Sequence, residues 1–466
     1  MDDVIERLYA QFSQTHAVTT DSRAITPGCI FFAFKGNHFD GNAFANQALS
    51  QGAALCVVSD SQYASDSRCV LVSDVLVALQ QLATYYRSQL TIPVVGITGT
   101  NGKTTTKELV REVLSRRYRV HATQGNYNNH IGVPLTILST PVDTEILIVE
   151  MGASHIGEIA DLCAIAQPTV GLITNCGKAH LEGFGSFENV VHTKTDLYRS
   201  LAANHGVMVV NADDTVLMQA ATALTEVSQP TPIPSCYMPS IPSAALEDAE
   251  GCAAMVTYGN SSEAEVKGSL MPPADADLRH AFMRYYFELG DQVYTIQSQL
   301  TGAYNFSNAM AATAIGLYFK VEPFDIKDAV EHYQPSNNRS QYKQTARNQL
   351  ILDCYNANPS SMAAAIQNFS LLAHPHKVAV LGEMRELGAA SEKEHQVVVN
   401  QIVSLNPDAV YLVGEAFAFA SSWPNVTVVS DTDELIALLL RQPISDALLL
   451  VKGSNSNKLW TIEPYL

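Results

Sequence analysis

A glycine-rich loop stands between an apolar run and a polar helix start near the end of the first quarter of the chain. The apolar run covers residues 92–97, and the loop reads Gly99-Thr100-Asn101-Gly102-Lys103-Thr104. Glycines let backbone N–H groups point at phosphate oxygens, a lysine brings positive charge to the β- and γ-phosphates, and a threonine hydroxyl can ligate Mg²⁺. The pattern predicts a nucleotide-phosphate site between a strand and a helix.

The loop departs from the strict phosphate-loop pattern GxxxxGK[ST]. That pattern places its first glycine at Ile97, whereas this chain has Gly96 and Gly99. A glycine-rich turn without phosphate chemistry is the alternative, but Gly-Lys-Thr-Thr at a helix start favours phosphate binding. The candidate nucleotide-binding residues of the loop are Gly99, Thr100, Asn101, Gly102, Lys103, Thr104 and Thr105.

Composition excludes several classes of protein. With 466 residues, 47% of them hydrophobic, the chain can form two to four domains with their own cores. The net charge of −18 argues against non-specific nucleic-acid binding. The eight cysteines form no Cys-x-x-Cys pair, which indicates reduced thiols in a cytoplasmic protein. No apolar run is long enough to span a membrane, so we expect no membrane insertion.

We expect three α/β domains, at residues 1–90, 91–334 and 335–466. Strands alternate with helices, which indicates a central doubly wound, mostly parallel sheet with the phosphate loop, a small amino-terminal α/β domain and a Rossmann-like last domain. The expected strands cover 29–34, 92–97, 145–150, 169–175, 206–211, 350–353, 378–382, 409–414 and 447–451, with a β-like region at 283–300. The expected helices cover 41–52, 75–88, 104–116 and 305–318. Prolines at 230, 232 and 234 predict a surface loop over 228–242.

Two polar side chains follow predicted strands at the sheet edge where ligands of doubly wound folds bind. Glu150 ends an apolar strand, so it would face the loop and suits Mg²⁺; an ordinary strand-end acid is the alternative. His180 follows the next strand after a glycine turn. It is either a metal ligand or a structural histidine. Lys194 lies on a helix that starts near Phe187, where a surface lysine is the default interpretation.

Four further polar positions stand at helix starts and strand ends. Asn305 and Asn308 begin a helix, and capping that helix is the alternative to ligand binding. Arg339 lies at the second domain junction, where it can reach a γ-phosphate or be a solvated linker residue. Asp353 ends a strand, and an Asn-Pro turn that caps a helix at Ser360 is the alternative for the polar loop that follows.

Taken together, the motifs resemble the Mur ligase family along the whole chain. The most specific segments are 98–105, 126–134 and 150–153, joined in the last domain by 353–359, 381–388, His395 and 451–454; the amino-terminal motifs at 21–23, 35–36 and 39–41 are individually weak. The Asp-Asn-Pro-Arg box of the relative that adds a diamino acid is not found here, which favours the branch of the family that adds a dipeptide. Asn338, where many relatives have glycine, and residues 228–280 depart from the family pattern.

The resemblance implies a monomeric, cytoplasmic, ATP- and Mg²⁺-dependent ligase that joins D-alanyl-D-alanine to UDP-N-acetylmuramoyl-tripeptide through an acyl phosphate, with a hinge near residues 335–339. It implies that Lys194 is carbamylated, which turns a cation into an anionic metal ligand. The implied catalytic residues are Lys103, Glu150, His180, Lys194 and Arg339, and the implied metal ligands are Thr104, Glu150, His180 and Lys194. Beyond the loop, the implied nucleotide-binding residues are Asn305, Asn308, Arg339 and Asp353. The implied substrate-binding residues are Ser22, Arg23, Lys35, Gly41, Asn128, Asn129, Ser154, Tyr355, Asn356 and Asn358.

Two other classes of protein share part of this pattern. A phosphate-loop kinase or GTPase would use the loop and Glu150 but leave the first and last domains without a task. A non-catalytic nucleotide-binding protein would bind ATP without turnover.

Overall fold

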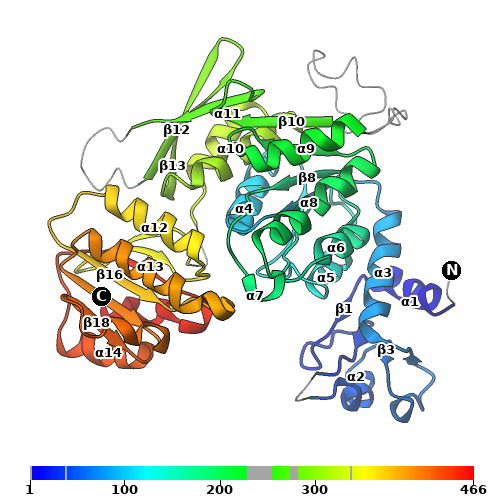
Figure 1. The fold of residues 1–466 in the computed structure, drawn as a ribbon. Coiled ribbons are helices and arrows are strands. Elements are labelled where there is room, and N and C mark those ends of the chain that lie inside the picture. Colours follow the sequence, from blue (N-terminus) through cyan, green and yellow to red (C-terminus); the bar gives the residue numbers. More distant parts are fainter. Residues whose placement is uncertain (1–2, 37–38, 228–253, 273–281, 336–337) are drawn as a thin grey trace.

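A computed structural model describes residues 3–36, 39–227, 254–272, 282–335 and 338–466 (Figure 1). Its strands form three sheets, made in turn by residues 18–71, 94–301 and 341–452. This arrangement confirms the predicted α/β class with three sheets. The domain limits stay predictions, as does the loop at 228–242, which lies outside the described residues.

The amino-terminal sheet has four parallel strands in the order β1-β2-β3-β4. The strands are β1 (Val18–Thr19), β2 (Ile30–Phe32), β3 (Leu55–Val58) and β4 (Cys69–Leu71). The helices are α1 (Asp3–Thr15), η1 (Gly41–Phe44), α2 (Ala45–Ser50), η2 (Ser61–Tyr63) and α3 (Val75–Gln89). The helix expected at 41–52 is divided into a 3₁₀ turn, whose start is capped by the Asp40 side chain, and a short α-helix that begins at Ala45.

The central sheet has nine strands in the order β13-β12-β11-β10-β9-β8-β5-β7-β6. Pairs from β6 to β11 are parallel, and β12 and β13 form an antiparallel hairpin at one edge. The strands are β5 (Val94–Thr98), β6 (Val120–Ala122), β7 (Ile146–Glu150), β8 (Val170–Ile173), β9 (Val207–Asn211), β10 (Ala254–Gly259), β11 (Val266–Leu270), β12 (Phe282–Leu289) and β13 (Gln292–Thr301). A mostly parallel central sheet is therefore confirmed.

Helices cover both faces of the central sheet, as a doubly wound fold requires. On one face α4 packs against α10, because α4 presents the apolar stripe Leu109, Val110 and Val113 to the core. On the other face α6 packs against α8, and α3 lies against α5 and α6, which joins the amino-terminal core to the central one. The helices are α4 (Lys103–Leu114), α5 (Gly132–Leu138), α6 (Glu158–Ala166), α7 (Leu181–Phe184), α8 (Phe187–Ala203), α9 (Thr215–Val227), α10 (Asn305–Tyr318) and α11 (Pro323–His332).

The carboxyl-terminal sheet has six strands in the order β14-β15-β19-β16-β17-β18, parallel except for the edge strand β14. The strands are β14 (Gln341–Gln344), β15 (Gln349–Asp353), β16 (Lys377–Gly382), β17 (Ala409–Val413), β18 (Val426–Val429) and β19 (Leu448–Lys452). The helices are α12 (Pro359–Leu371), η4 (Gly388–Ala390), α13 (Ser391–Ser404), η5 (Glu415–Ala420), α14 (Thr432–Arg441), η6 (Asn455–Asn457) and η7 (Leu459–Tyr465). Open parallel sheets of this kind bind ligands at the carboxyl ends of their strands.

The cysteines and the helices bear on two expectations from composition. Six cysteines lie within the described residues, and all six are free thiols. No helix in the described ranges is both long enough and apolar enough to cross a bilayer.

Candidate active site

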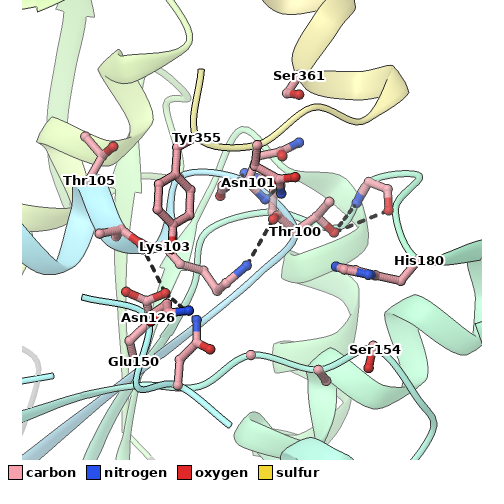
Figure 2. A pocket seen from close by; sticks show the side chains of 18 of the residues that line it. Thr100, Asn101, Lys103, Thr105, Asn126, Glu150, Ser154, His180, Tyr355 and Ser361 are labelled. Carbon is pink, nitrogen blue, oxygen red and sulfur yellow. Dashed lines mark hydrogen bonds between the residues drawn. The ribbon is translucent and has the colours of Figure 1, made fainter. Parts of the chain in front are cut away.

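A cavity of about 1280 Å³ lies where the central sheet meets the carboxyl-terminal part of the chain. Its walls come from the glycine-rich loop, the end of β7, the turn after β8, the start of α10 and loops of the carboxyl-terminal sheet (Figure 2). The strand register explains why the glycine-rich loop lies beside the end of β7. Ile97 of β5, just before the loop, pairs with Glu150 of β7 at the same sheet edge. Lys103, Glu150 and His180, predicted from separate motifs, share this cavity.

The glycine-rich loop has a backbone that only glycine allows at two positions. Gly99 has φ 141° and a Cβ there would lie 2.0 Å from Thr174 Oγ1; Gly102 has φ 81° and a Cβ would lie 2.5 Å from Asn308 Oδ1. The loop is tied to the turn after β8, because the Thr100 N–H donates to the Asn175 carbonyl over 2.9 Å. The loop is thus rigidly placed at the start of α4.

The Lys103 side chain folds back onto the loop that carries it. Its Nζ donates to the Gly99 carbonyl at 2.7 Å and to the Thr100 carbonyl at 3.0 Å. Burial lowers the pKa of Lys103 to about 8, against the opposing effect of the Glu150 charge, and Arg339 lowers it further. An anion such as a phosphate would favour the charged form of this lysine.

Glu150 is almost fully buried and has one carboxylate oxygen without a partner. Its Oε1 accepts hydrogen bonds from Thr104 Oγ1 at 3.1 Å and Asn128 Nδ2 at 2.8 Å, while Oε2 is buried and unpartnered. A buried carboxylate oxygen without a partner is costly unless a cation meets it. The side chains of Thr104 and Glu150 therefore fit Mg²⁺, which takes oxygen ligands and completes its shell with phosphates and water. Within the described residues, no group of three His, Cys, Asp or Glu side chains is placed to hold a metal ion.

His180 and Lys194 flank the cavity differently. Nδ1 of His180 contacts Glu386 Oε2 from the carboxyl-terminal part of the chain, and His180 lines the cavity. Lys194 is 2% exposed and lies behind the lining, with Nζ 5.8 Å from the centre of the Phe184 ring, so the interpretation as a surface lysine is wrong. Burial lowers the pKa of Lys194 to about 7, and the nearby Lys103 charge adds to this effect.

Asn305 and Asn308 link α10 to the end of β13 and to α4 instead of capping the helix. Asn305 Nδ2 donates to the Thr301 carbonyl at 2.8 Å, Asn308 Nδ2 donates to Asn305 Oδ1 at 2.9 Å, and Asn308 Oδ1 accepts from Thr106 Oγ1 at 3.1 Å. The residue before the helix, Tyr304, makes no side-chain cap. Both asparagines line the cavity.

Arg339 and Asp353 bring the carboxyl-terminal part to the cavity. The Arg339 guanidinium lies 3.7 Å from the centre of the Tyr355 ring, and its Nε is buried without a partner, so it is not a solvated linker residue. Asp353 Oδ2 accepts from Lys452 Nζ at 2.7 Å, and the same ammonium donates to the Asn356 carbonyl. Arg339, Asp353, Tyr355 and Asn356 all line the cavity.

The remaining predicted residues have varied positions. Asn128, Asn129 and Ser154 line the cavity, whereas Asn358 caps α12 and also donates to Asn101 Oδ1 at 2.8 Å. The interpretation of the Asn-Pro turn as a helix cap is therefore confirmed, and the same asparagine also contacts the glycine-rich loop; its role in substrate binding stays a prediction. The residues that do not line the cavity are Gly99, Lys194, Asn358, Ser22, Arg23, Lys35 and Gly41.

Several lining residues were not among the predicted site residues. Arg385 and Glu386 follow β16, and Lys452 and Ser454 lie at the end of β19. Their motifs stood out in the sequence, and their signal was the same as for Glu150: polar residues at the carboxyl ends of parallel strands.

Comparisons with known proteins agree along the chain. Profiles described as "Mur ligase family, catalytic domain", "Mur ligase middle domain" and "Mur ligase, glutamate ligase domain" match residues 14–94, 97–230 and 338–455. The UDP-N-acetylmuramoyl-tripeptide--D-alanyl-D-alanine ligase of Bacillus subtilis is 32% identical, over 96% of this chain and 93% of that protein. The ligase of the same name from Escherichia coli is 33% identical, over 94% and 91%. The chain belongs to the Mur ligase family.

Solved structures agree with this assignment. MurF from Acinetobacter baumannii superposes on this Mur ligase with a TM-score of 0.81 and 28% identity, over 96% of this chain and 92% of that one. MurF from Thermotoga maritima in complex with ADP, at 24% identity and a TM-score of 0.80, shares the fold. The middle-domain match of this Mur ligase contains Lys103, Glu150, His180 and Lys194. Like its family, it is an ATP-dependent enzyme that requires Mg²⁺.

Proposed function

We propose that this enzyme joins D-alanyl-D-alanine to UDP-N-acetylmuramoyl-tripeptide, with conversion of ATP to ADP and phosphate, in cytoplasmic peptidoglycan precursor synthesis. The names of the relatives support this reaction. One structural observation carries most of the proposal: Lys103 and Glu150 of the central part share one cavity with Arg339 and Tyr355 of the carboxyl-terminal part. A nucleotide and an acceptor amine can therefore meet there.

The chemistry requires activation of a carboxylate. A free carboxylate is a poor electrophile, so its oxygen first takes the γ-phosphoryl group of ATP, giving an acyl phosphate and ADP. The amine then attacks the carbonyl carbon, phosphate leaves with the electrons of the C–O bond, and the amine loses a proton. Lys103 and Arg339 offset the repulsion between the two anions in the first step.

The proposal for the metal ligands starts from the partnerless oxygen of Glu150. Thr104 and Glu150 would hold Mg²⁺, with His180 and a carbamylated Lys194 as the further ligands that we propose. Bound Mg²⁺ neutralises charge that develops on the transferred phosphoryl group. Carbamylation needs a neutral amine, which adds to CO₂ with loss of one proton, and a pKa of Lys194 near 7 supplies that amine at neutral pH.

We assign the parts of the substrates to four groups of residues. Ser22, Arg23, Lys35 and Gly41 would contact the uridine diphosphate, away from the cavity lining. Asn128, Asn129 and Ser154 would contact the peptide, and Tyr355, Asn356 and Asn358 the incoming dipeptide. Asn305, Asn308 and Asp353 would contact ATP with the loop.

The acyl phosphate must be kept from water while the amine binds, so closure of the last domain onto the centre is part of the proposal. The contact between Asn101 and Asn358 supports it, as does the Lys178 N–H that donates to Ser360 Oγ at 3.2 Å. The hinge expected near residues 335–339 stays a prediction. We also propose that the enzyme acts as a monomer.

Mass spectrometry of the nucleotide product tests the reaction. The full chain is incubated with UDP-N-acetylmuramoyl-tripeptide, D-alanyl-D-alanine and Mg-ATP, and each component is left out in turn. We expect a product heavier than the donor by one dipeptide less water, with ADP and phosphate formed only when donor and amine are both present. The Lys103→Ala variant should fold and give no product. ADP formation independent of the dipeptide would favour a kinase, and no turnover with any donor would favour a binding protein.

A further inference from the structure

A contact between two distant parts of the chain involves a residue of the proposed metal site. Nδ1 of His180 contacts Glu386 Oε2, and 206 positions separate the two residues in the sequence. His180 follows β8 of the central sheet, whereas Glu386 follows β16 of the carboxyl-terminal sheet. Figure 2 shows the His180 ring beside Thr100 at the wall of the cavity. The carboxylate and the imidazole are thus supplied by different parts of the molecule.

The backbone at both residues is in the left-handed region. His180 has φ 50° and Glu386 has φ 60°. Residues other than glycine adopt this conformation rarely, and it persists where the surroundings determine it, often at functional sites. Both residues of the contact therefore have a left-handed backbone conformation.

The chemistry of imidazole gives this contact a consequence. A neutral histidine has one N–H, and a carboxylate at Nδ1 favours the proton on that nitrogen, which leaves the lone pair of Nε2 free. Histidines that bind metals commonly donate their other N–H to a carboxylate, and this partner fixes the tautomer and the ring orientation.

We propose that Glu386 is a positioning residue for the Mg²⁺ site, which holds His180 as the Nδ1–H tautomer so that Nε2 can bind the metal while the two parts of the chain are in contact. The inference rests on the proposed function, in which His180 is a ligand beside Glu150. It makes the metal site depend on a side chain of the carboxyl-terminal part. Metal affinity and contact between the parts are then coupled.

An ion pair at the same interface provides a matched control. Lys178, two residues before His180, has its Nζ 3.8 Å from Glu394 Oε1. This pair therefore also joins the two parts of the chain. Glu394 has no hydrogen bond or ion pair with His180 among the contacts of the described residues. Glu394→Gln therefore weakens the interface without altering the histidine.

Binding of Mn²⁺ to the full chain in the presence of ADP, measured by electron paramagnetic resonance of the free ion, tests the proposal. Mn²⁺ accepts the same ligands as Mg²⁺. We expect Glu386→Ala to weaken Mn²⁺ binding about tenfold. Glu386→Gln should have a smaller effect, because its amide oxygen still accepts from Nδ1–H, and Glu394→Gln should bind as the wild type does.

Two results would overturn the inference: unchanged affinity in Glu386→Ala, or an equal loss in Glu386→Ala and Glu394→Gln, which would assign the effect to the interface in general. Glu150→Gln separates this failure from that of the proposed function. If Glu150→Gln binds Mn²⁺ like the wild type, the proposed metal site itself is wrong. If only Glu150→Gln loses affinity, the site stands and the role of Glu386 fails.

Nuclear magnetic resonance gives a readout that does not depend on the metal. Long-range ¹H–¹⁵N spectra of the chain with ¹⁵N-labelled histidine report the tautomer, and a His180→Asn variant assigns the signal. We expect the Nδ1–H pattern in the wild type and its loss in Glu386→Ala. An Nε2–H pattern in the wild type would contradict the proposal.

Discussion

The Thr104 hydroxyl donates a hydrogen bond of 3.1 Å to Glu150 Oε1, which joins the end of the phosphate loop to the end of β7. The bond uses one oxygen of the carboxylate, and the second oxygen is left buried without a partner. A hydroxyl and a carboxylate held together in this way provide two oxygens for a cation before any ligand is bound. Substitutions at this site and in its surroundings therefore have distinct expected effects.

Replacing Gly102 by alanine should abolish nucleotide binding. The position has φ 81°, and the new Cβ would lie 2.5 Å from Asn308 Oδ1, which is itself bonded to Thr106. Gly157→Ala is a matched control, because Gly157 precedes α6 with φ 89° and a Cβ added there would meet no atom within 4 Å. Both variants should lose about 1 to 2 kcal/mol of stability from backbone strain. Calorimetric titration with ADP should show a large loss of affinity in Gly102→Ala alone; equal affinities would contradict the close fit of loop and α10.

Glu150→Gln should lower the turnover rate by roughly 100-fold or more, because the amide keeps the shape but loses the charge that attracts Mg²⁺. The unfolding midpoint should not fall, since the partnerless buried oxygen no longer carries a charge. Rates are measured against Mg²⁺ concentration, with Glu145→Gln at the opposite end of β7 as the control. A rate and a Mg²⁺ dependence like those of the wild type would remove Glu150 from the metal site.

Carbamylation makes activity depend on CO₂. Enzyme held at mildly acidic pH and then freed of CO₂ should lose activity and regain it when bicarbonate is added. Lys194→Ala should be inactive and partly rescued by a short carboxylic acid such as acetate, which can replace the missing anion in the space left by the lysine. If activity does not depend on CO₂ and the Lys194→Ala variant has the wild-type rate, Lys194 is not a metal ligand.

The stability of the protein relative to Lys194→Met should rise with pH between about 7 and 10.5 in CO₂-free buffer. The pKa of Lys194 falls from 10.5 in the unfolded chain to about 7 in the fold because of burial. In this window the unfolded chain binds more protons at this site, so unfolding becomes less favourable as pH rises, by at most about 1.4 kcal/mol per pH unit. Denaturant unfolding of both proteins from pH 7 to 10 measures the difference, and a flat or falling difference would contradict the burial of a neutral lysine.

Much of the fold was predictable from the periodicity of apolar residues and from the polar residues at the ends of apolar runs. The strands that lead to Glu150 and Asp353 and the helix that begins at Asn305 were predicted because each combines an apolar run with polar residues at its boundary. Short edge strands such as β14 carry too few apolar residues for such a signal.

The site was predictable where one local motif carried the chemistry, as in the glycine-rich loop. It was not predictable where the environment comes from distant segments. Lys194 of α8 is buried by neighbours that its own helix does not specify, and Glu386 meets His180 only because the central and carboxyl-terminal parts of the chain are in contact there. Such contacts depend on tertiary packing, which the spacing of residues within a single segment does not predict.

Transfer of ¹⁸O tests the central claim most directly. The donor is prepared with both oxygens of its terminal carboxylate labelled and is incubated with the enzyme, ATP and D-alanyl-D-alanine, and the phosphate released is examined by mass spectrometry. If that carboxylate attacks the γ-phosphorus in the shared cavity, each phosphate carries one ¹⁸O atom and the new amide keeps the other. Unlabelled phosphate beside a labelled product would show that ATP is cleaved without forming an acyl phosphate, and would contradict the account.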